Sequence, residues 1–280
     1  MPKILAATDL TRRSANVLGR SARLARRLGA SVIYVHVPRS RPRGVGRIAR
    51  TMLRPGRPTL TPLDRLQAEA SAHPDVAISC CVLDGAPHEA LIALARAEDP
   101  ALVVLGLHRE RPLDLLRLTT MERVVLGVDA PVLIAHRTPE ADYARVLGAV
   151  SFAPSCARAL GVAAHIAPDA AIHAIHALRM PLRDRLSPTE AADTPSMTEA
   201  ELLRDAFCAM PDIPQTLHRP EIVIGGVHEV LGFRIDELRP DLLTIGTHSG
   251  RDATALGNYA RDLMRKPPAD LLVVKPPPAG

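Results

Sequence analysis

The chain has 280 residues, of which 47% are hydrophobic, but only 2% are aromatic and tryptophan is absent. This length suits one large or two ordinary α/β domains with cores of aliphatic side chains. No apolar run approaches the length of a membrane span and no signal-peptide pattern opens the chain, so we expect a cytoplasmic protein without membrane contact. The four cysteines show no C-x-x-C spacing, which is typical of structural thiols in a reducing compartment.

The net charge of +5 is divided unevenly along the chain. Residues 1–138 carry a net charge of +9 and residues 139–280 a net charge of −4. Between Leu10 and Leu63 there are thirteen arginines and no acidic residue. A solvated basic face is the usual cause of such a run, and attraction of a polyanion is the alternative.

The first unit, Lys3–Val37, is predicted to form a strand, a long helix and a second strand. Residues 4–7 are a continuous apolar run, as in a parallel strand that is covered on both faces. The helix has one apolar stripe and ends at Gly29. Four arginines lie off this stripe and are expected to form a basic outer face: Arg13, Arg20, Arg23 and Arg27. Because such a unit is a right-handed parallel crossover, a ligand is expected where the first strand ends, at Asp9.

The rest of the first half alternates in the same way. Residues 39–57 are rich in Pro, Gly and Arg and are expected to form an exposed loop. The elements expected after it are a helix at about 60–73, a strand at 76–83, a helix at 87–97, a strand at 101–106, a helix near 119–128 and a strand at 131–135. This order of strands and helices predicts a doubly wound sheet.

The sequence then repeats with a period of about 140 residues. The segment DGAPHEALIALARAEDPALVVLGLH aligns with GGVHEVLGFRIDELRPDLLTIGTH, and KILAATDL aligns with RVLGAVSF. Near the ends of the two copies, PVLIAH aligns with DLLVVK. We therefore predict two duplicated domains, a first repeat (1–138) and a second repeat (143–280), joined by a short linker.

The ordered set of ATDL, a helix ending in LGA, VHV, VVLG and PVLI resembles the universal stress protein family in its tandem form. In the second repeat, LLTIGTHSG, LGN and DLLVVKP complete the resemblance. It implies an α/β fold of two tandem Rossmann-like (adenine nucleotide α-hydrolase-like) domains, each with a five-stranded parallel sheet flanked by helices. It also implies that the repeats pair with each other through their last strands, and it leaves a homodimer open.

Members of this family that bind ATP place adenine and ribose near the ends of the first two strands. Their phosphates lie on a glycine loop after the fourth strand, with the pattern G-x-x-G and, further on, G followed by Ser, Thr or Asn. Glycines let the backbone approach a phosphate, and the N–H groups at a helix N-terminus favour negative charge.

In the first repeat, the resemblance assigns a degraded ATP or ADP site to these residues: Asp9, Val37, Gly106, Arg109, Thr119 and Thr120. The second and third glycine positions hold Arg109 and Thr119. If the loop needs a positive φ at these positions, each non-glycine residue costs about 1–2 kcal/mol, and threonine is β-branched as well. Contact between Arg109 and a phosphate would offset part of this cost.

In the second repeat, the corresponding residues are Gly246, Ser249, Gly250, Gly257 and Asn258. The loop is shorter than the family pattern, with Ser249 where the second glycine is expected. Ser151 stands where the first repeat has Asp9, and the loss of one charged hydrogen bond costs about 1.5–3 kcal/mol. Because neither copy is intact, we expect adenine nucleotide binding to be weak or absent.

No enzyme motif accompanies these sites. The chain lacks G-x-G-x-x-G after the first strand, a P-loop and a G-x-S-x-G elbow, so no catalytic residue is predicted. Histidines at matching positions of the two repeats (His36 with His176, His108 with His248) are interpreted as inherited scaffold and not as metal ligands. The favoured hypothesis is a non-catalytic stress-response scaffold that acts through protein partners. The alternatives are an ATP-binding switch with at most slow hydrolysis, and nucleic-acid or other polyanion binding by the 39–57 loop, which lacks interleaved aromatic residues.

Overall fold

The computed structural model describes residues 1–38, 60–107, 118–179, 194–247 and 256–276. The elements of the first repeat are β1 (Lys3–Thr8), the 3₁₀ turn η1 (Arg12–Ser14), α1 (Ala15–Leu28), β2 (Ser31–His36), α2 (Pro62–Ala70), β3 (Ile78–Val82), α3 (Pro87–Glu98), β4 (Leu102–Gly106), α4 (Thr120–Gly127) and β5 (Val132–Ala135). Those of the second are β6 (Arg145–Ala149), α5 (Pro154–Ile166), β7 (Ala171–Leu178), α7 (Pro195–Cys208), β8 (Glu221–Ile224), α8 (Val227–Leu238), β9 (Leu242–Gly246), α9 (Asn258–Arg265) and β10 (Asp270–Val274).

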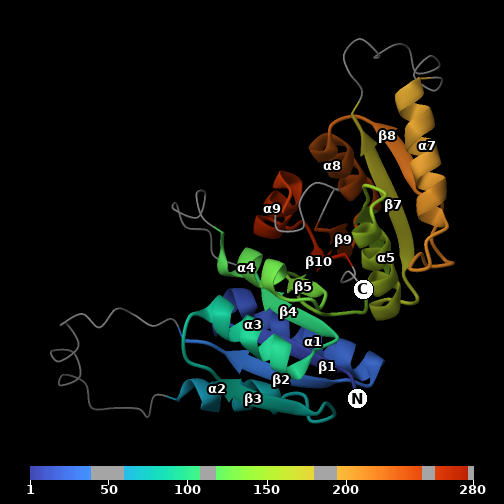
Figure 1. Cartoon of the computed structure of the whole chain (residues 1–280). Helices are drawn as coiled ribbons and strands as arrows, with labels where there is room; N and C mark the ends of the chain where they lie inside the picture. The colour runs from blue at the N-terminus through green and yellow to red at the C-terminus, as the bar shows by residue number, and fades with distance from the viewer. Residues whose placement is uncertain (39–59, 108–117, 180–193, 248–255, 277–280) are drawn as a thin grey trace.

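The described strands form one ten-stranded sheet in the order β3-β2-β1-β4-β5-β10-β9-β6-β7-β8. Within each repeat the five strands are parallel. The repeats meet where β5 runs antiparallel to β10, with Leu133 opposite Leu272. Figure 1 shows the two halves on either side of this seam. The predicted fold and the pairing through the last strands are therefore confirmed.

Helices cover both faces of the sheet. Side chains of α1, α2, α5 and α7 pack on one face, and those of α3, α4, α8 and α9 on the other. Along β1, Ile4 and Ala6 face the first layer and Leu5 faces the second, so both sides of the strand are buried. The continuous apolar run that starts the chain follows from this double burial.

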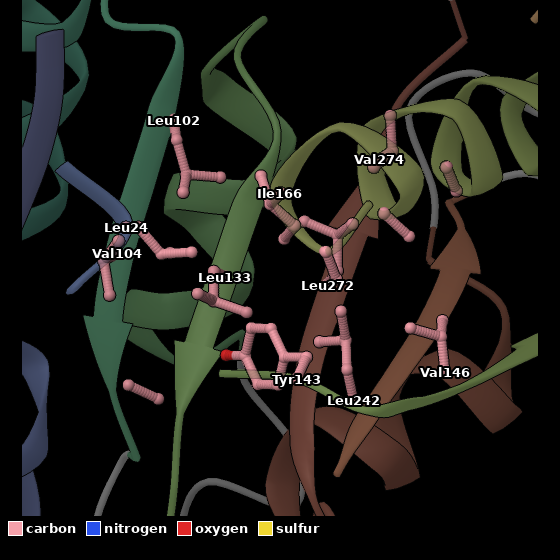
Figure 2. Close-up of a cluster of buried hydrophobic side chains, with 14 of the residues drawn as sticks. Leu24, Leu102, Val104, Leu133, Tyr143, Val146, Ile166, Leu242, Leu272 and Val274 are labelled. Carbon is pink, nitrogen blue, oxygen red and sulfur yellow. The ribbon is translucent and has the colours of Figure 1, made fainter. Parts of the chain in front are cut away.

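The apolar core continues across the seam between the repeats. Leu133 on β5 and Leu272 on β10 belong to one buried cluster, together with Leu102 from the first repeat and Val146 from the second. Figure 2 shows these side chains forming a single layer that crosses the paired strands. Because burial of apolar surface is the main stabilising term, the two repeats share one core and stabilise each other.

Arg20 departs from the expected basic outer face, and the expectation is wrong for this residue. Its side chain is nearly inaccessible, and its Nη1 donates to the carbonyl oxygen of Ala141 at 3.0 Å. Its guanidinium lies 4.2 Å from the ring centroid of Tyr143, and its Nε lies 3.0 Å from Oδ2 of Asp270. Position 20 is three residues after Val17 and therefore borders the buried stripe, close enough to reach the second repeat.

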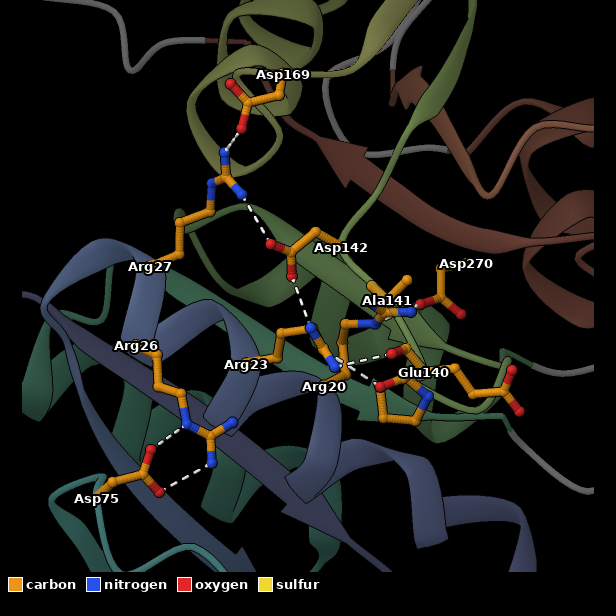
Figure 3. Close-up of polar contacts among 11 residues, drawn as sticks. Arg20, Arg23, Arg26, Arg27, Asp75, Glu140, Ala141, Asp142, Asp169 and Asp270 are labelled. Carbon is orange, nitrogen blue, oxygen red and sulfur yellow. Dashed lines mark hydrogen bonds and ion pairs between the residues drawn. The ribbon is translucent and has the colours of Figure 1, made fainter.

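Two further arginines of α1, Arg23 and Arg27, bind the linker between the repeats (139–142). Arg23 donates to the carbonyl oxygen of Glu140 at 2.9 Å and to Oδ1 of Asp142 at 3.1 Å. Arg27 bridges Asp142 and Asp169, the latter in the second repeat (Figure 3). These arginines of the basic face are thus paired within the chain, and part of the charge asymmetry between the repeats is neutralised at their junction.

Within the described ranges, no helix is long and apolar enough to cross a membrane.

Candidate functional site

A cleft of about 740 Å³ opens in the first repeat where β1, β2 and β4 end. Its size is in the range of small-ligand sites. Four of the predicted site residues line it: Asp9, Val37, Gly106 and Thr120. Thr119 is adjacent in sequence to this wall, and Arg109 lies outside the described residues. The parallel strands therefore bring the candidate residues together at their carboxyl ends, as expected for this sheet.

Asp9 is held by the turn that follows β1. Its Oδ1 accepts hydrogen bonds from the Thr11 N–H at 3.0 Å, the Thr11 hydroxyl at 2.6 Å and the Ser14 hydroxyl at 2.7 Å. The Ser14 hydroxyl also lies 2.8 Å from Oγ1 of Thr8. The carboxylate thus stabilises a turn in which Leu10 has a φ of 57°. Asp9 has a structural role here, independent of any ligand.

Gly106 and Gly246 are required by packing. A Cβ on Gly106 would lie 2.8 Å from Cα of Ser14, and one on Gly246 would lie 2.9 Å from the backbone nitrogen of Cys156. Neither glycine is among the described residues with a positive φ. In each repeat the fourth strand ends against the start of the first helix, and only glycine fits this approach. A glycine at this position is therefore no proof of a phosphate contact.

The positive φ that would make a non-glycine residue costly is absent at Thr119. Thr119 has φ −69° and ψ 163°, close to φ −61° and ψ 152° at the equivalent Gly257. Both residues are N-caps in the extended region, which any L-residue adopts. Thr119 and Glu122 form a capping box: Oγ1 of Thr119 accepts from the Glu122 N–H at 3.2 Å, and Oε2 of Glu122 accepts from the Thr119 N–H at 2.6 Å.

Glu122 was not among the residues predicted for the site, although the pattern T-x-x-E at 119–122 is a known signature of helix starts. Its side chain is fully buried, and Oε1 lies 3.3 Å from both Nε of Arg261 and Nη2 of Arg265 on α9. An internal carboxylate therefore already occupies part of the N-terminus of α4. The N-terminus of α4 therefore attracts a phosphate more weakly than an uncapped helix N-terminus does.

The second repeat replaces the polar pair at the end of its first strand. Ser151 stands at the position of Asp9 and Cys156 at the position of Ser14, with the Ser151 N–H 3.4 Å from the Cys156 sulfur. Phe152, which follows, is buried, and its ring centroid lies 4.5 Å from that of His176 and 5.5 Å from that of Phe207. An aromatic cluster thus lies next to Ser151, the residue that is equivalent to Asp9 of the first repeat.

The helix start of the second repeat is open in comparison. Gly257, the N-cap of α9, makes no side-chain capping bond, and Asn258 is exposed. Ser249 and Gly250 lie outside the described residues. The first repeat therefore keeps the acid and has a capped helix, whereas the second has an uncapped helix and no acid.

The histidines on the second strand of each repeat make the same structural contact. Nδ1 of His36 donates to the carbonyl oxygen of Thr8 at 2.8 Å, and Nδ1 of His176 donates to that of Val150 at 2.9 Å. This matched contact supports the interpretation of the pair as scaffold. His108 and His248 lie outside the described residues. In the part of the chain that the structure covers, no three His, Cys, Asp or Glu side chains gather in a metal-binding group.

The sequence model of the universal stress protein family matches the chain twice, over residues 1–136 and 142–275. The chain belongs to the universal stress protein family. The two matches make it a tandem member, with one copy on each side of the β5–β10 seam. The limits of its domains, 1–138 and 143–280, stay a prediction. No curated protein matches this universal stress protein by sequence.

Solved structures agree with this assignment at the level of the fold. A protein of Pseudomonas aeruginosa UCBPP-PA14 described as a universal stress protein has a TM-score of 0.69 and 17% identity, and the match covers 99% of this chain and 94% of that one. A universal stress protein from Archaeoglobus fulgidus DSM 4304 has a TM-score of 0.61 and 17% identity, with 99% and 97% of the chains covered. At such identities the likeness extends to the fold alone.

Proposed function

We propose that this universal stress protein is a non-catalytic, cytoplasmic scaffold of the stress response that acts through protein partners and binds adenine nucleotides weakly, in its first repeat only. The observation that carries this proposal is the division of the site between the repeats. Asp9 lies on a cleft that is partly lined by α4, whose N-terminus is capped by Glu122, whereas the uncapped helix α9 belongs to the repeat with Ser151 in place of the acid.

The energetic consequence is a loss of affinity in both copies. In the second repeat, the missing charged hydrogen bond accounts for about 1.5–3 kcal/mol, or one to two decades of affinity. In the first repeat, the Thr119 N–H is already bound by the Glu122 carboxylate, which also adds negative charge at the helix start. Each copy therefore lacks one of the two features that hold a nucleotide.

The contacts in the cleft also support a non-catalytic role. The Ser14 hydroxyl bonds Asp9 and Thr8, and no described contact joins it to a histidine. Nδ1 of His36 is taken by a backbone carbonyl. A nucleophile, a base and an orienting group, which acyl or phosphoryl transfer requires, are not assembled among these contacts.

The experiment is to extract the purified full-length chain for bound nucleotide and to measure phosphate release from ATP. We expect no co-purified nucleotide and phosphate release at the rate of a protein-free blank. Asp9→Asn is the matched control, since it removes the acid without a large change of shape. One ATP or ADP per purified chain, or phosphate release that Asp9→Asn abolishes, would contradict the proposal.

A second candidate is an ATP-binding switch of the same family, and the cleft of about 740 Å³ with Asp9 on its wall favours it. This candidate predicts that Asp9→Ala weakens ATP binding by more than about tenfold, the effect of one charged hydrogen bond. Unchanged binding in that variant would remove it. The third alternative, polyanion binding, depends on the 39–57 loop, which lies outside the described residues.

A further inference from the structure

Helix α4 stands between the first-repeat cleft and the second repeat. Thr120, Met121 and Val124 line the cleft from this helix. Glu122, on the same helix, instead reaches Arg261 and Arg265 on α9. One wall of the cleft is therefore built on an element that the other repeat contacts directly.

The second repeat also contacts the opposite end of α4. Nζ of Lys275, just after β10, donates to the carbonyl oxygen of Leu126 at 3.1 Å and lies 3.1 Å from Oδ1 of Asp129. A lysine at a helix C-terminus is favourable because the last carbonyl groups there carry partial negative charge. Both ends of α4 are thus fixed by residues of the second repeat.

The buried Glu122 carboxylate needs these partners. A buried charge is tolerated only when it is neutralised and hydrogen-bonded, and removal of one partner is strongly destabilising. Arg123, the neighbouring basic residue on α4, points elsewhere, since it donates to the Leu118 carbonyl oxygen and lies 3.2 Å from Nε2 of His88. The arginines that neutralise Glu122 in the described structure come from α9.

This contact has no counterpart in the opposite direction. Thr119 and Gly257 are equivalent N-caps, so the positions that match Glu122 and Arg265 are Ala260 and Gly127. Helix α9 therefore carries no buried acid for the first repeat to neutralise at this position. The dependence of one repeat's helix on the other's arginines is one-sided.

We propose that Arg261 and Arg265 are positioning residues of the first-repeat cleft, which they control by holding Glu122 and, through it, the first turn of α4. Without the positive charge of these arginines, the Glu122 carboxylate is stable only in contact with water. To reach water it must give up its hydrogen bond to the Thr119 N–H, which breaks the capping box. The first turn then frays, and the wall formed by Thr120 and Met121 is displaced. The second repeat is in this way a structural regulator of the cleft in the first.

The main test needs no ligand: hydrogen exchange of the full-length chain with the double substitution Arg261→Gln and Arg265→Gln. We expect the amides of residues 119–124 to exchange at least about tenfold faster, as local opening becomes easier. Adding Glu122→Gln to this variant is expected to restore slow exchange, because a neutral amide keeps the capping contact without needing the arginines. Arg234→Gln, which loses ion pairs to Glu221 and Glu237 on the far side of the second repeat, is the control and leaves these amides unchanged.

A second arm uses ADP as the probe and rests on the proposed function. If the wild type binds ADP in the first repeat, the double variant binds it more weakly and the triple variant recovers. If the wild type does not bind ADP, the nucleotide part of the proposed function fails, and the exchange result alone decides this inference. Unchanged exchange in the double variant, or no recovery with Glu122→Gln, overturns the inference. If the double variant does not fold, recovery of folding by Glu122→Gln supports it and failure to recover overturns it.

Discussion

Arg20 of α1 and Asp270 of β10 form a buried ion pair across the two repeats, with Nε 3.0 Å from Oδ2 and side chains that are 5% and 0% exposed. Asp270 also accepts from the His136 and Arg137 N–H groups, each at 2.8 Å, and from the Tyr143 hydroxyl at 2.7 Å. Burial, together with the adjacent Asp270 charge, raises the pKa of Tyr143 well above its usual value. The phenol therefore remains a hydrogen-bond donor to this carboxylate.

Two buried carboxylates of the described structure lie where the repeats meet, one from each repeat. Asp270 belongs to the second repeat and is neutralised by Arg20 of the first. Glu122 belongs to the first repeat and is neutralised by Arg261 and Arg265 of the second. Among the described residues, each of these two carboxylates is paired with arginine from the other repeat, which ties the folding of the two repeats together.

Arg20→Met is expected to destabilise the protein by about 3–5 kcal/mol, because it leaves the Asp270 carboxylate buried without its cation. Adding Asp270→Asn is expected to recover part of this loss, since the amide oxygen still accepts from the two backbone N–H groups. Urea unfolding measures both. Arg26→Ala is the control: its partner Asp75 is exposed, and such pairs are worth at most about 1 kcal/mol. Equal effects of Arg20→Met and Arg26→Ala would refute the role of the buried pair.

Gly106→Ala is expected to cost about 1–3 kcal/mol of stability without any nucleotide, because its Cβ would overlap the Ser14 backbone. Gly257→Ser, at the N-cap of α9, is the comparison variant, because Gly257 also belongs to the family's glycine pattern but is not closely packed. No described residue lies within 4 Å of a Cβ on Gly257, and serine is a preferred N-cap, so stability is expected to stay the same or rise slightly. Thermal unfolding of both variants checks this. A Gly106→Ala protein as stable as the wild type would show that the close approach at Ser14 is easily relieved.

Thr119→Gly, which installs the glycine of the family pattern, is expected not to strengthen ATP binding. The backbone at Thr119 already has the conformation found at Gly257, so no strain is available for release. Thr119→Ala is expected to cost about 1 kcal/mol through the lost cap, whereas Thr119→Ser retains it. Calorimetric titration and urea unfolding measure the two effects. A clear gain of ATP affinity in Thr119→Gly would mean that the threonine obstructs the ligand.

The ion pair between Arg26 and Asp75 predicts a defined pH dependence. The hydrogen bond from Arg26 lowers the pKa of the Asp75 carboxyl from 3.8 to about 2. Because the folded pKa lies below the unfolded one, the contribution to stability is present above pH 3.8 and is lost as the pH falls through about 2. Asp75→Asn is therefore expected to flatten the decline of stability in this acidic window, as followed by unfolding at a series of pH values. An identical slope in the variant and the wild type would contradict the assignment.

Much of the fold follows from local sequence patterns. The apolar run at 4–7, the repeat of His36 at His176 and the matching end strands predicted two duplicated α/β units, because strand burial and duplication both leave local signals. The five-stranded sheets and their pairing through the last strands were implied by the resemblance to the family. The pairing of Arg20 with Asp270 was beyond prediction, since the two residues lie 250 positions apart in the sequence and meet only when the repeats pack.

The site was predicted in part. Asp9 and Gly106 were expected in one site and both line the cleft, but the packing of Gly106 against Ser14 was not predicted, because it depends on how closely the first helix approaches the fourth strand. At Thr119 the family pattern suggested a strained turn, whereas Glu122 three residues later signalled an N-cap. That local signal was the better guide to the backbone.

The most direct test of the proposed function is a calorimetric titration of the full-length chain with ATP and with ADP. We expect one site per chain with a Kd weaker than about 100 μM, loss of that binding in Asp9→Ala and no effect of Asn258→Ala. A Kd of about 1 μM or tighter, which corresponds to roughly −8 kcal/mol, or two sites per chain, would contradict the proposed function.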